Sequence, residues 1–260
     1  MNKLFKRDFK MVVIGQIISL FGNAILRFAL PLYLLRETDS SSLFGAVTAC
    51  AFIPMVIFSL FGGVIADRKN KRNIMVALDF TTAAVILIFS FALGKVLLVP
   101  LMIAVLMILY GISGIYQPAV QASIPLIVEK QFLMQGNAVI NMVSTLAGLL
   151  GPIIGGVLFG AFGIMPILFI SVGCFVFSAV MEIFIYIPFE KNTDGKSIFG
   201  AVGSDLSDSF QFIKNEKPIF LSVLGIPALF NLILSAMMLV GIHVIVVQIL
   251  GMSDTALGIT

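Results

Sequence analysis

Three charged side chains lie inside long apolar runs of this sequence. They are Arg27, Asp79 and Glu182. On insertion scales a charge at the middle of a membrane helix costs about 2.5 to 3.5 kcal/mol, so such residues are rare and usually functional. A carboxyl group in a low-dielectric site favours its neutral form, which makes Glu182 a candidate proton carrier. The alternative is that Glu182, six residues before Pro188, simply reaches the membrane interface. Arg27 could hold a counter-carboxylate or an anionic substrate group.

Polar side chains also recur at helical spacing on two of these runs. The two sets, each with intervals of three, four and four residues, are Gln16, Ser19, Asn23 and Arg27, and Tyr110, Ser113, Gln117 and Gln121. Residues at this spacing share one helix face, so each set forms a polar stripe. A stripe either lines a water-accessible cavity or hydrogen-bonds neighbouring helices. The apolar character of the neighbouring runs favours the cavity.

The composition leaves little material for a soluble enzyme. Hydrophobic residues make up 60% of the 260 positions and charged residues 11%, with a mean hydropathy of +1.13, whereas soluble domains are roughly a quarter charged. The single histidine, His243, and the two cysteines, Cys50 and Cys174, stand apart from one another in apolar runs. No His, Cys or carboxylate pair has catalytic or metal-binding spacing. We therefore predict no enzyme activity, metal, cofactor or nucleic-acid partner.

Seven apolar runs are long enough to cross a membrane as helices. Their approximate limits are 11–35, 43–66, 74–94, 97–120, 137–161, 165–188 and 219–249. Lipid offers no partner to backbone N–H and C=O groups, and the period-two pattern of a barrel is absent, so these runs predict helices. The predicted fold class is all-α and polytopic, with the lipid bilayer as the main surroundings.

Basic residues gather on alternate connections between the runs. Of the 16 Lys and Arg residues, 13 lie before the first run or after the second, fourth and sixth runs, two lie on the opposite connections, and Arg27 lies inside a run. The positive-inside rule then places the N-terminus in the cytoplasm. The first run is too long for a signal peptide and has no cleavage site, so we predict a retained span in the cell membrane.

The longest polar interruption divides the chain. We predict a six-span bundle over residues 1–190, a cytoplasmic linker over 191–217, and the start of a second bundle over 218–260. Within the linker, apolar residues at helical spacing predict an amphipathic surface helix: Phe199, Val202, Leu206, Phe210 and Ile213. Residues 250–260 repeat the pattern of residues 35–48, each after an odd-numbered span. The sequence therefore predicts a longer repeat protein of which this chain is a part.

A dense motif connects the second and third runs. It reads Gly63-Val64-Ile65-Ala66-Asp67-Arg68-Lys69-Asn70-Lys71-Arg72. This resembles the Gly-x-Leu-Ala-Asp-Arg-x-Gly-Arg-Arg signature of the major facilitator superfamily, with Asn70 in place of the second Gly. Gly63 would allow close helix approach, Asp67 could meet a helix N-terminus or an Arg, and Asn70, like Gly, tolerates the left-handed backbone of a tight turn.

The resemblance implies a cytoplasmic gate latch at this motif. An ordinary positive-inside turn would explain the basic residues but not the spacing of Gly63, Asp67 and Arg68. We include Asp79, near the start of the third run, in the same cluster. The predicted gate residues are Gly63, Asp67, Arg68, Lys71, Arg72 and Asp79.

A glycine-rich motif lies in the fifth run. It reads Gly148-Leu149-Leu150-Gly151-Pro152-Ile153-Ile154-Gly155-Gly156 and resembles the antiporter motif Gly-x-x-x-Gly-Pro-x-x-Gly-Gly of the same superfamily, with its first Gly one residue closer. Gly151 and Gly155 form a small-residue face for tight packing, and Pro152 removes one helix hydrogen bond. The alternative is an ordinary glycine-mediated helix interface. The predicted antiporter motif comprises Gly148, Gly151, Pro152, Gly155 and Gly156.

The resemblance extends over the whole chain, aligned with the first seven of twelve spans, and residues 23–35 are similar to the macrolide and multidrug efflux branch. It implies that the first, fourth and seventh spans line a cavity, to which Asn231 and Ser235 would contribute. Residues 106–111 lack the family's usual basic residue, which departs from its standard proton-coupling arrangement. His243 is predicted to be a packed or interfacial residue.

The function that the resemblance implies is export of amphipathic or hydrophobic small molecules by proton antiport, by a protein that is monomeric at full length. An uptake symporter or facilitator, or a siderophore exporter, remains an alternative within the superfamily. From another class, a seven-span receptor-like protein is the alternative. The seventh run carries no Lys for a retinal Schiff base, and the predicted N-terminus lies inside, which disfavour the receptor.

Overall fold

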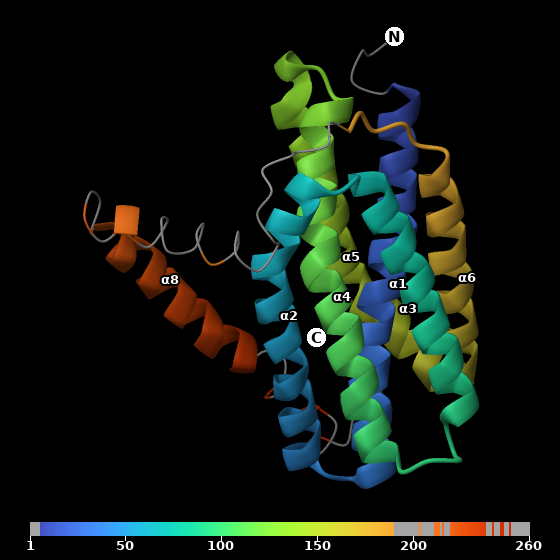
Figure 1. Ribbon diagram of the computed structural model, residues 1–260. Coiled ribbons are helices and arrows are strands. Elements are labelled where there is room, and N and C mark those ends of the chain that lie inside the picture. Colours follow the sequence, from blue (N-terminus) through green and yellow to red (C-terminus); the bar gives the residue numbers. More distant parts are fainter. Residues whose placement is uncertain are drawn as a thin grey trace.

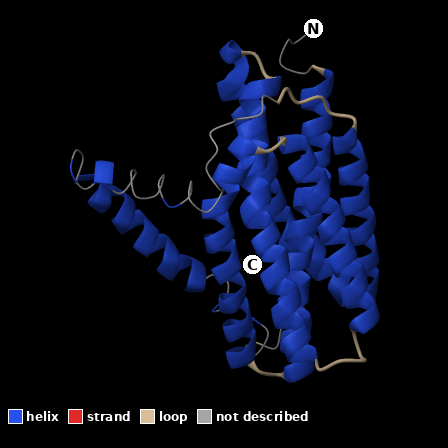
Figure 2. Cartoon of the chain, viewed as in Figure 1, coloured by secondary structure: helices blue, strands red, loops and turns tan. Residues whose placement is uncertain are grey.

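The computed structural model describes residues 6–189 and, beyond them, 203, 211–213, 215, 219–237, 241, 245, 246 and 250. Within these residues the chain consists of helices and short connections, without a β-strand (Figure 2). Six of the helices are long and apolar enough to cross a membrane. The predicted all-α, polytopic fold class is therefore confirmed.

The helix bounds follow the first six apolar runs. The helices are α1 (Arg7–Thr38), α2 (Ser41–Arg68), α3 (Lys71–Ala92), α4 (Leu98–Ile127), the short 3-10 turn η1 (Lys130–Phe132), α5 (Leu133–Phe162), α6 (Ile164–Ile183) and α8 (Ile219–Ala236). Helix α6 ends five residues before the predicted limit of its run, and α8 covers the first part of the seventh run. Most of the predicted amphipathic helix lies outside the described residues, and so does His243.

Short polar or glycine positions end one helix and begin the next. The Ser40 hydroxyl accepts a hydrogen bond from the Leu43 N–H at 3.3 Å and so caps the start of α2. Gly163 has a φ of 73°, a left-handed backbone that favours glycine, and it joins α5 directly to α6. These caps let consecutive helices reverse direction within a few residues.

The six helices form one bundle, with α1 near its centre (Figure 1). Helix α1 packs against α5 and α6, α3 packs against α6 and α4, and α2 packs against α4. Two apolar clusters fill the interior, one around Leu30, Phe89 and Phe175 and the other around Phe9 and Met75, closer to the N-terminal end of α1. Each helix that has several neighbours therefore contacts them through different faces.

Glycines bring α2 and α4 into close contact. A Cβ atom on Gly62 would lie 2.7 Å from the carbonyl oxygen of Gly114, and one on Gly114 would lie 2.6 Å from the carbonyl oxygen of Met55. Gly111 faces the Phe58 ring in the same way. The motif glycine Gly63 has no atom within 4 Å of its Cβ position. The prediction that Gly63 permits close helix approach is therefore wrong by one residue, because helical rotation turns Gly62 toward α4 instead.

The glycine motif of α5 faces α1. A Cβ atom on Gly151 would overlap the Cβ atom of Ala24, and one on Gly155 would lie 3.2 Å from the Phe28 ring. Gly148 has open space at its Cβ position, and Pro152 stands within the helix. Two of the motif's glycines thus form the small-residue face that the sequence predicts, while the first does not contact another helix.

We expect Gly151→Leu to destabilise the bundle, because a side chain there must push α5 away from α1. Overpacking of this kind costs about 1 to 3 kcal/mol. Thermal unfolding of the purified protein in detergent should show a lower Tm than wild type. Gly148→Leu is the matched control on the same helix and should leave the Tm unchanged. Equal Tm values for the two variants would contradict the packing of α5 on α1.

Candidate functional site

Six polar side chains from four helices meet inside the bundle. They are Gln16 and Ser19 on α1, Asp79 on α3, Tyr116 on α4, and Ser178 and Glu182 on α6, and none is more than 4% exposed. Polar groups in an apolar interior need hydrogen-bond partners, so their meeting point holds these four helices together. We call this group the buried polar cluster.

A directed chain of hydrogen bonds runs through the cluster. The Gln16 Nε2 group donates to the Tyr116 hydroxyl at 2.7 Å, and that hydroxyl donates to the Glu182 Oε1 atom at 2.7 Å. The Ser19 hydroxyl donates to the Asp79 Oδ1 atom at 3.1 Å. The Ser178 hydroxyl donates to the Gly15 carbonyl oxygen at 3.1 Å. Each carboxyl group therefore accepts a hydrogen bond through one of its two oxygens.

The other oxygen of each carboxyl group is buried without a partner. The unpaired atoms are Asp79 Oδ2, Glu182 Oε2 and Gln16 Oε1. Within the described part of the chain, neither acid forms an ion pair. An ion pair between Lys6 and Glu129 lies elsewhere in the bundle. Two ionised carboxylates in one buried cluster repel each other, and a proton or another cation relieves that repulsion. The site is thus built to accept positive charge.

The structure places Glu182 and Asp79 differently from the simplest sequence interpretations. Glu182 is 1% exposed and bonded to Tyr116, so it does not reach toward the interface. Asp79 was grouped with Asp67 at the gate motif, but it points into the bundle, whereas Asp67 is exposed at the end of α2. The reason is helical phase, because Asp79 lies more than two turns into α3, where its carboxylate meets Ser19 of α1 inside the bundle.

Asn70 also has a different role from the one predicted. Its φ of −64° and ψ of 115° are extended, not left-handed. The Asn70 side chain caps α3 by accepting a hydrogen bond from the Arg72 N–H at 3.0 Å. The remaining gate residues Arg68, Lys71 and Arg72 are partly exposed at this turn.

The two predicted stripes are each divided between interior and surface. On α1, Gln16 and Ser19 are buried, while Asn23 and Arg27 are partly exposed. On α4, Tyr110 is buried, Ser113 and Gln117 are partly exposed, and Gln121 is exposed. On α8, Asn231 and Ser235 are both exposed. The inner half of the first stripe therefore bonds neighbouring helices, and the outer half is partly exposed.

Sequence reasoning missed Tyr116 and Ser178, which complete the buried polar cluster. Tyr116 stands next to Gln117 but outside the α4 stripe, and its hydroxyl connects α1 to α6. Ser178 precedes Glu182 by one helical turn, so a search for polar pairs on the sixth run would have found it.

A second charged group lies elsewhere on α1. The Arg27 guanidinium carbon stands 4.2 Å from the centre of the Tyr110 ring. The Tyr110 ring in turn meets Phe52 of α2 edge to face, with 5.1 Å between the ring centres. The guanidinium is therefore held against an aromatic wall by a cation–π contact.

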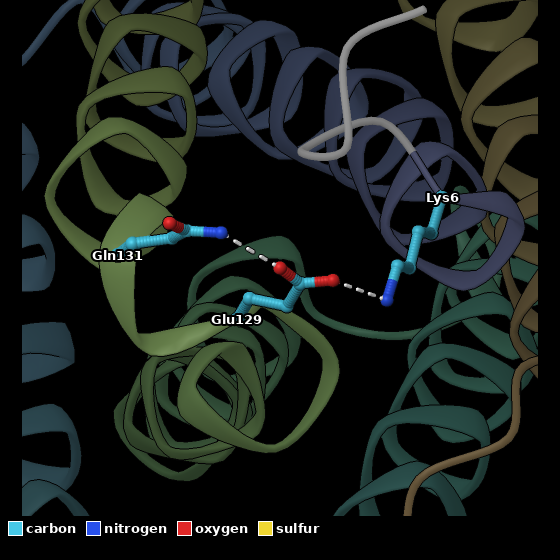
Figure 3. A network of polar contacts seen from close by, with 3 residues as sticks. All are labelled: Lys6, Glu129 and Gln131. Atoms are coloured by element: carbon cyan, nitrogen blue, oxygen red, sulfur yellow. Dashed lines mark hydrogen bonds and ion pairs between the residues drawn. The ribbon is translucent and has the colours of Figure 1, made fainter.

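The N-terminal end of the bundle is tied by polar contacts of a different kind. Lys6 Nζ and Glu129 Oε1 form an ion pair at 2.7 Å, and Gln131 Nε2 donates to Glu129 Oε2 at 3.0 Å (Figure 3). The Tyr186 N–H donates to Asp8 Oδ1 at 3.2 Å. These exposed contacts connect the start of α1 to the segments that follow α4 and α6, and each contributes little to stability.

Ionisable groups enclosed between helices of membrane-spanning length are rare and usually mark a functional site. The model of the Major Facilitator Superfamily matches residues 12–260, and the chain belongs to this superfamily. This is a family of transporters and not of enzymes.

Relatives and a solved structure agree with this family. The chain is 24% identical over 185 residues to macrolide efflux protein A of Streptococcus pyogenes, covering 71% of this chain and 46% of that protein. It is 28% identical over 160 residues to a Na+, Li+, K+/H+ antiporter of Planococcus maritimus, covering 60% and 37%. The POT family transporter PepTSo shares the fold with a TM-score of 0.60 at 17% identity, covering 81% of this chain and 48% of that one. The chain spans less than half the length of these relatives.

We expect Tyr116→Phe to lower stability, because it removes the hydroxyl that bonds Gln16 Nε2 and Glu182 Oε1 while keeping the ring. Leaving a buried polar group unsatisfied costs about 1 to 3 kcal/mol. The Tm in detergent should therefore fall. Tyr186→Phe, at a side chain that is 71% exposed, is the matched control and should not change it. A Tyr116→Phe protein as stable as wild type would contradict the hydrogen-bond chain.

Proposed function

We propose that this chain is part of a secondary transporter that exports amphipathic or hydrophobic small molecules in exchange for protons. Two relatives support the direction and the coupling, since one is named an efflux protein and the other a cation/H+ antiporter. The single observation that carries the proposal is the buried pair of acids, Asp79 and Glu182, without a cation partner among the described residues. In a transporter, such a pair of acids can bind and release protons.

Each acid has one unpaired oxygen, and we assign the proton to Glu182 because its hydrogen bond to Tyr116 connects it to both α4 and α1. Its Oε1 atom accepts from Tyr116, so the free Oε2 atom is the position where a proton would add. Adding that proton neutralises one of two neighbouring carboxylates, and it also creates an O–H donor in a cluster that has unpaired acceptors. Asp79 would respond electrostatically to the charge of Glu182, so the two acids titrate as a pair.

The position of the cluster suggests how proton binding would act on the cavity. It joins α1 and α4, whose stripes are partly exposed, to α3 and α6 on the other side. A change in its charge alters the bonds between these two helix pairs. We infer that proton release leaves carboxylates on both α3 and α6, so these two helices repel each other and their packing on α1 and α4 changes, which favours one orientation of the bundle.

The cavity of the complete transporter would be lined by the partly exposed polar residues of α1 and α4, and by Asn231 and Ser235 of α8. In the proposed orientation the N-terminus lies in the cytoplasm and the protein acts as a monomer in the cell membrane. The 13-to-2 distribution of basic residues supports the orientation.

The gate motif would act at the cytoplasmic turn between α2 and α3. Asp67 is exposed at the last turn of α2, where a carboxylate can meet a helix N-terminus or an arginine of the second bundle. Its exposed position in the six-helix bundle fits a contact that is made with another part of the complete transporter.

Transport in cells tests the proton coupling. We expect cells that express the complete reading frame to extrude a fluorescent amphipathic dye, and an uncoupler to stop the extrusion. Glu182→Gln keeps the shape and one hydrogen-bond acceptor but cannot exchange a proton, so extrusion should fall to the level of cells without the protein. Glu129→Gln, at the exposed ion pair, is the control and should retain extrusion. Extrusion by the Glu182→Gln protein that an uncoupler still abolishes would remove Glu182 as the carrier, and insensitivity of wild type to the uncoupler would remove proton antiport.

A separate variant tests the gate. Asp67→Asn should lower the rate of dye extrusion while leaving the amount of protein in the membrane unchanged, because an exposed side chain contributes little to folding. Quantitative immunoblotting of membranes gives the amount, and dye fluorescence gives the rate. Asp8→Asn offers a comparison at another acid of the same end of the bundle. An unchanged rate for Asp67→Asn would argue against a gate at this turn.

A further inference from the structure

Arg27 is a cation deep in the bundle for which the described residues provide no anion. Its guanidinium stacks on Tyr110, and its Nε atom is buried without a hydrogen-bond partner. The ion pair recorded among the described residues joins Lys6 to Glu129 at the end of the bundle and leaves Arg27 out. Placing an arginine at such a depth is costly, so a compensating anion is expected at some stage of the protein's cycle.

The two buried acids do not supply that anion. Asp79 is bonded to Ser19, which lies eight residues before Arg27 on α1, or about 12 Å along the helix axis at 1.5 Å per residue. Glu182 is bonded through Tyr116 to Gln16, which lies still farther away. The side chain of Arg27 is directed to the Tyr110 ring on α4. The positive and the negative groups of the bundle are therefore separate sites.

A phospholipid headgroup does not fit the depth of Arg27. The residue lies eight positions before Leu35, the end of the predicted span, or about 12 Å along the axis at 1.5 Å per residue. The hydrocarbon core is about 30 Å thick, so Arg27 lies well inside it. An anion that reaches it must enter between the helices.

The surroundings of Arg27 fit an amphipathic ligand. Asn23 lies one turn away on the same face of α1, is partly exposed and carries an amide donor. The aromatic pair Tyr110 and Phe52 adds an apolar wall beside the charge. A guanidinium binds an oxyanion through paired N–H donors, and the neighbouring rings would contact an apolar body.

We propose that Arg27, held by Tyr110, binds the anionic oxyacid group of an amphipathic cargo. The inference deepens the proposed export function by naming the cargo class as molecules with a carboxylate, sulfonate or phosphate group on an apolar body. Cationic amphipaths are disfavoured by the same charge. A carboxylate from the rest of the complete transporter is the competing partner for Arg27, and the experiment separates it from the cargo.

Binding of matched probes tests the inference. The complete transporter is purified, placed in nanodiscs of zwitterionic lipid, and titrated with dansylaminoundecanoate and with its terminal amide, which has the same length and no charge. We expect the carboxylate probe to bind about 10- to 100-fold more tightly, the effect of one charge-assisted hydrogen-bonded pair of about 1.5 to 3 kcal/mol. Arg27→Gln should abolish this preference, and Arg27→Lys should keep part of it. Arg36→Gln, at an exposed arginine near the end of the same helix, should leave it intact.

Equal affinities of wild type for the two probes would overturn the inference and point to a protein carboxylate as the partner of Arg27. A preference that survives in Arg27→Gln would overturn it as well. The wild-type comparison decides the question even if Arg27→Gln does not fold, which thermal unfolding would reveal. Dye extrusion is measured in cells that express the same variants. Anion preference without extrusion would refute only the export function, whereas extrusion without anion preference would refute only the Arg27 site.

Discussion

The structure depends on pairing polar groups inside a bundle whose outer surface meets lipid. Lipid provides no hydrogen-bond partners, so each polar side chain within the spans must find its partner on a neighbouring helix or on its own backbone. Tyr116 shows the consequence most clearly. Its hydroxyl accepts from Gln16 on α1 and donates to Glu182 on α6, both at 2.7 Å, and so connects α4 to both of those helices. A shift of any one of the three helices breaks a buried hydrogen bond. The relative positions of these helices and the hydrogen-bonding state of the acids are therefore linked.

Glycine contacts on other faces make that junction possible. Gly62 and Gly114 bring the backbones of α2 and α4 together, and Gly151 lets α5 lie against Ala24 of α1. These contacts are made by backbone atoms and small side chains, which lose little conformational entropy and depend on close van der Waals approach. They use the faces of α1 and α4 that point away from α3 and α6. The remaining faces are then free to carry the bulkier polar side chains of the buried cluster.

Much of the fold could be predicted from the sequence, because membrane helices leave a strong signal of length and hydropathy. The first six helices lie where the apolar runs predict them, with ends that differ by up to seven residues. The glycine face at Gly151 and Gly155 was also predicted, because small residues four positions apart lie on the same face of a helix. Side-chain partners could not be predicted in the same way. Asp79 was assigned to the gate by its closeness in sequence to Asp67, yet helical rotation turns it toward Ser19, 60 residues away in the chain. Tyr116 was missed because its role depends on which helix faces it. The sequence of a single apolar run does not indicate the order of the helices around the bundle.

The separation of charges along α1 has a consequence for the proposed antiport. If proton and cargo competed for one acidic site, a cationic cargo would be expected to replace the proton directly. Here the acids lie in the buried polar cluster, and the arginine lies about 12 Å farther along α1 than Ser19, counted at 1.5 Å per residue. Proton and anionic cargo would thus bind at different places and communicate through α1 and α4, each of which contributes side chains to both. Coupling of this kind requires that the two sites favour different orientations of the same helices, and the fixed hydrogen bonds of Gln16 and Tyr116 provide a rigid connection for it. A deprotonated cluster would then alter the tilt of α1 relative to α6, and with it the position of Arg27 against Tyr110.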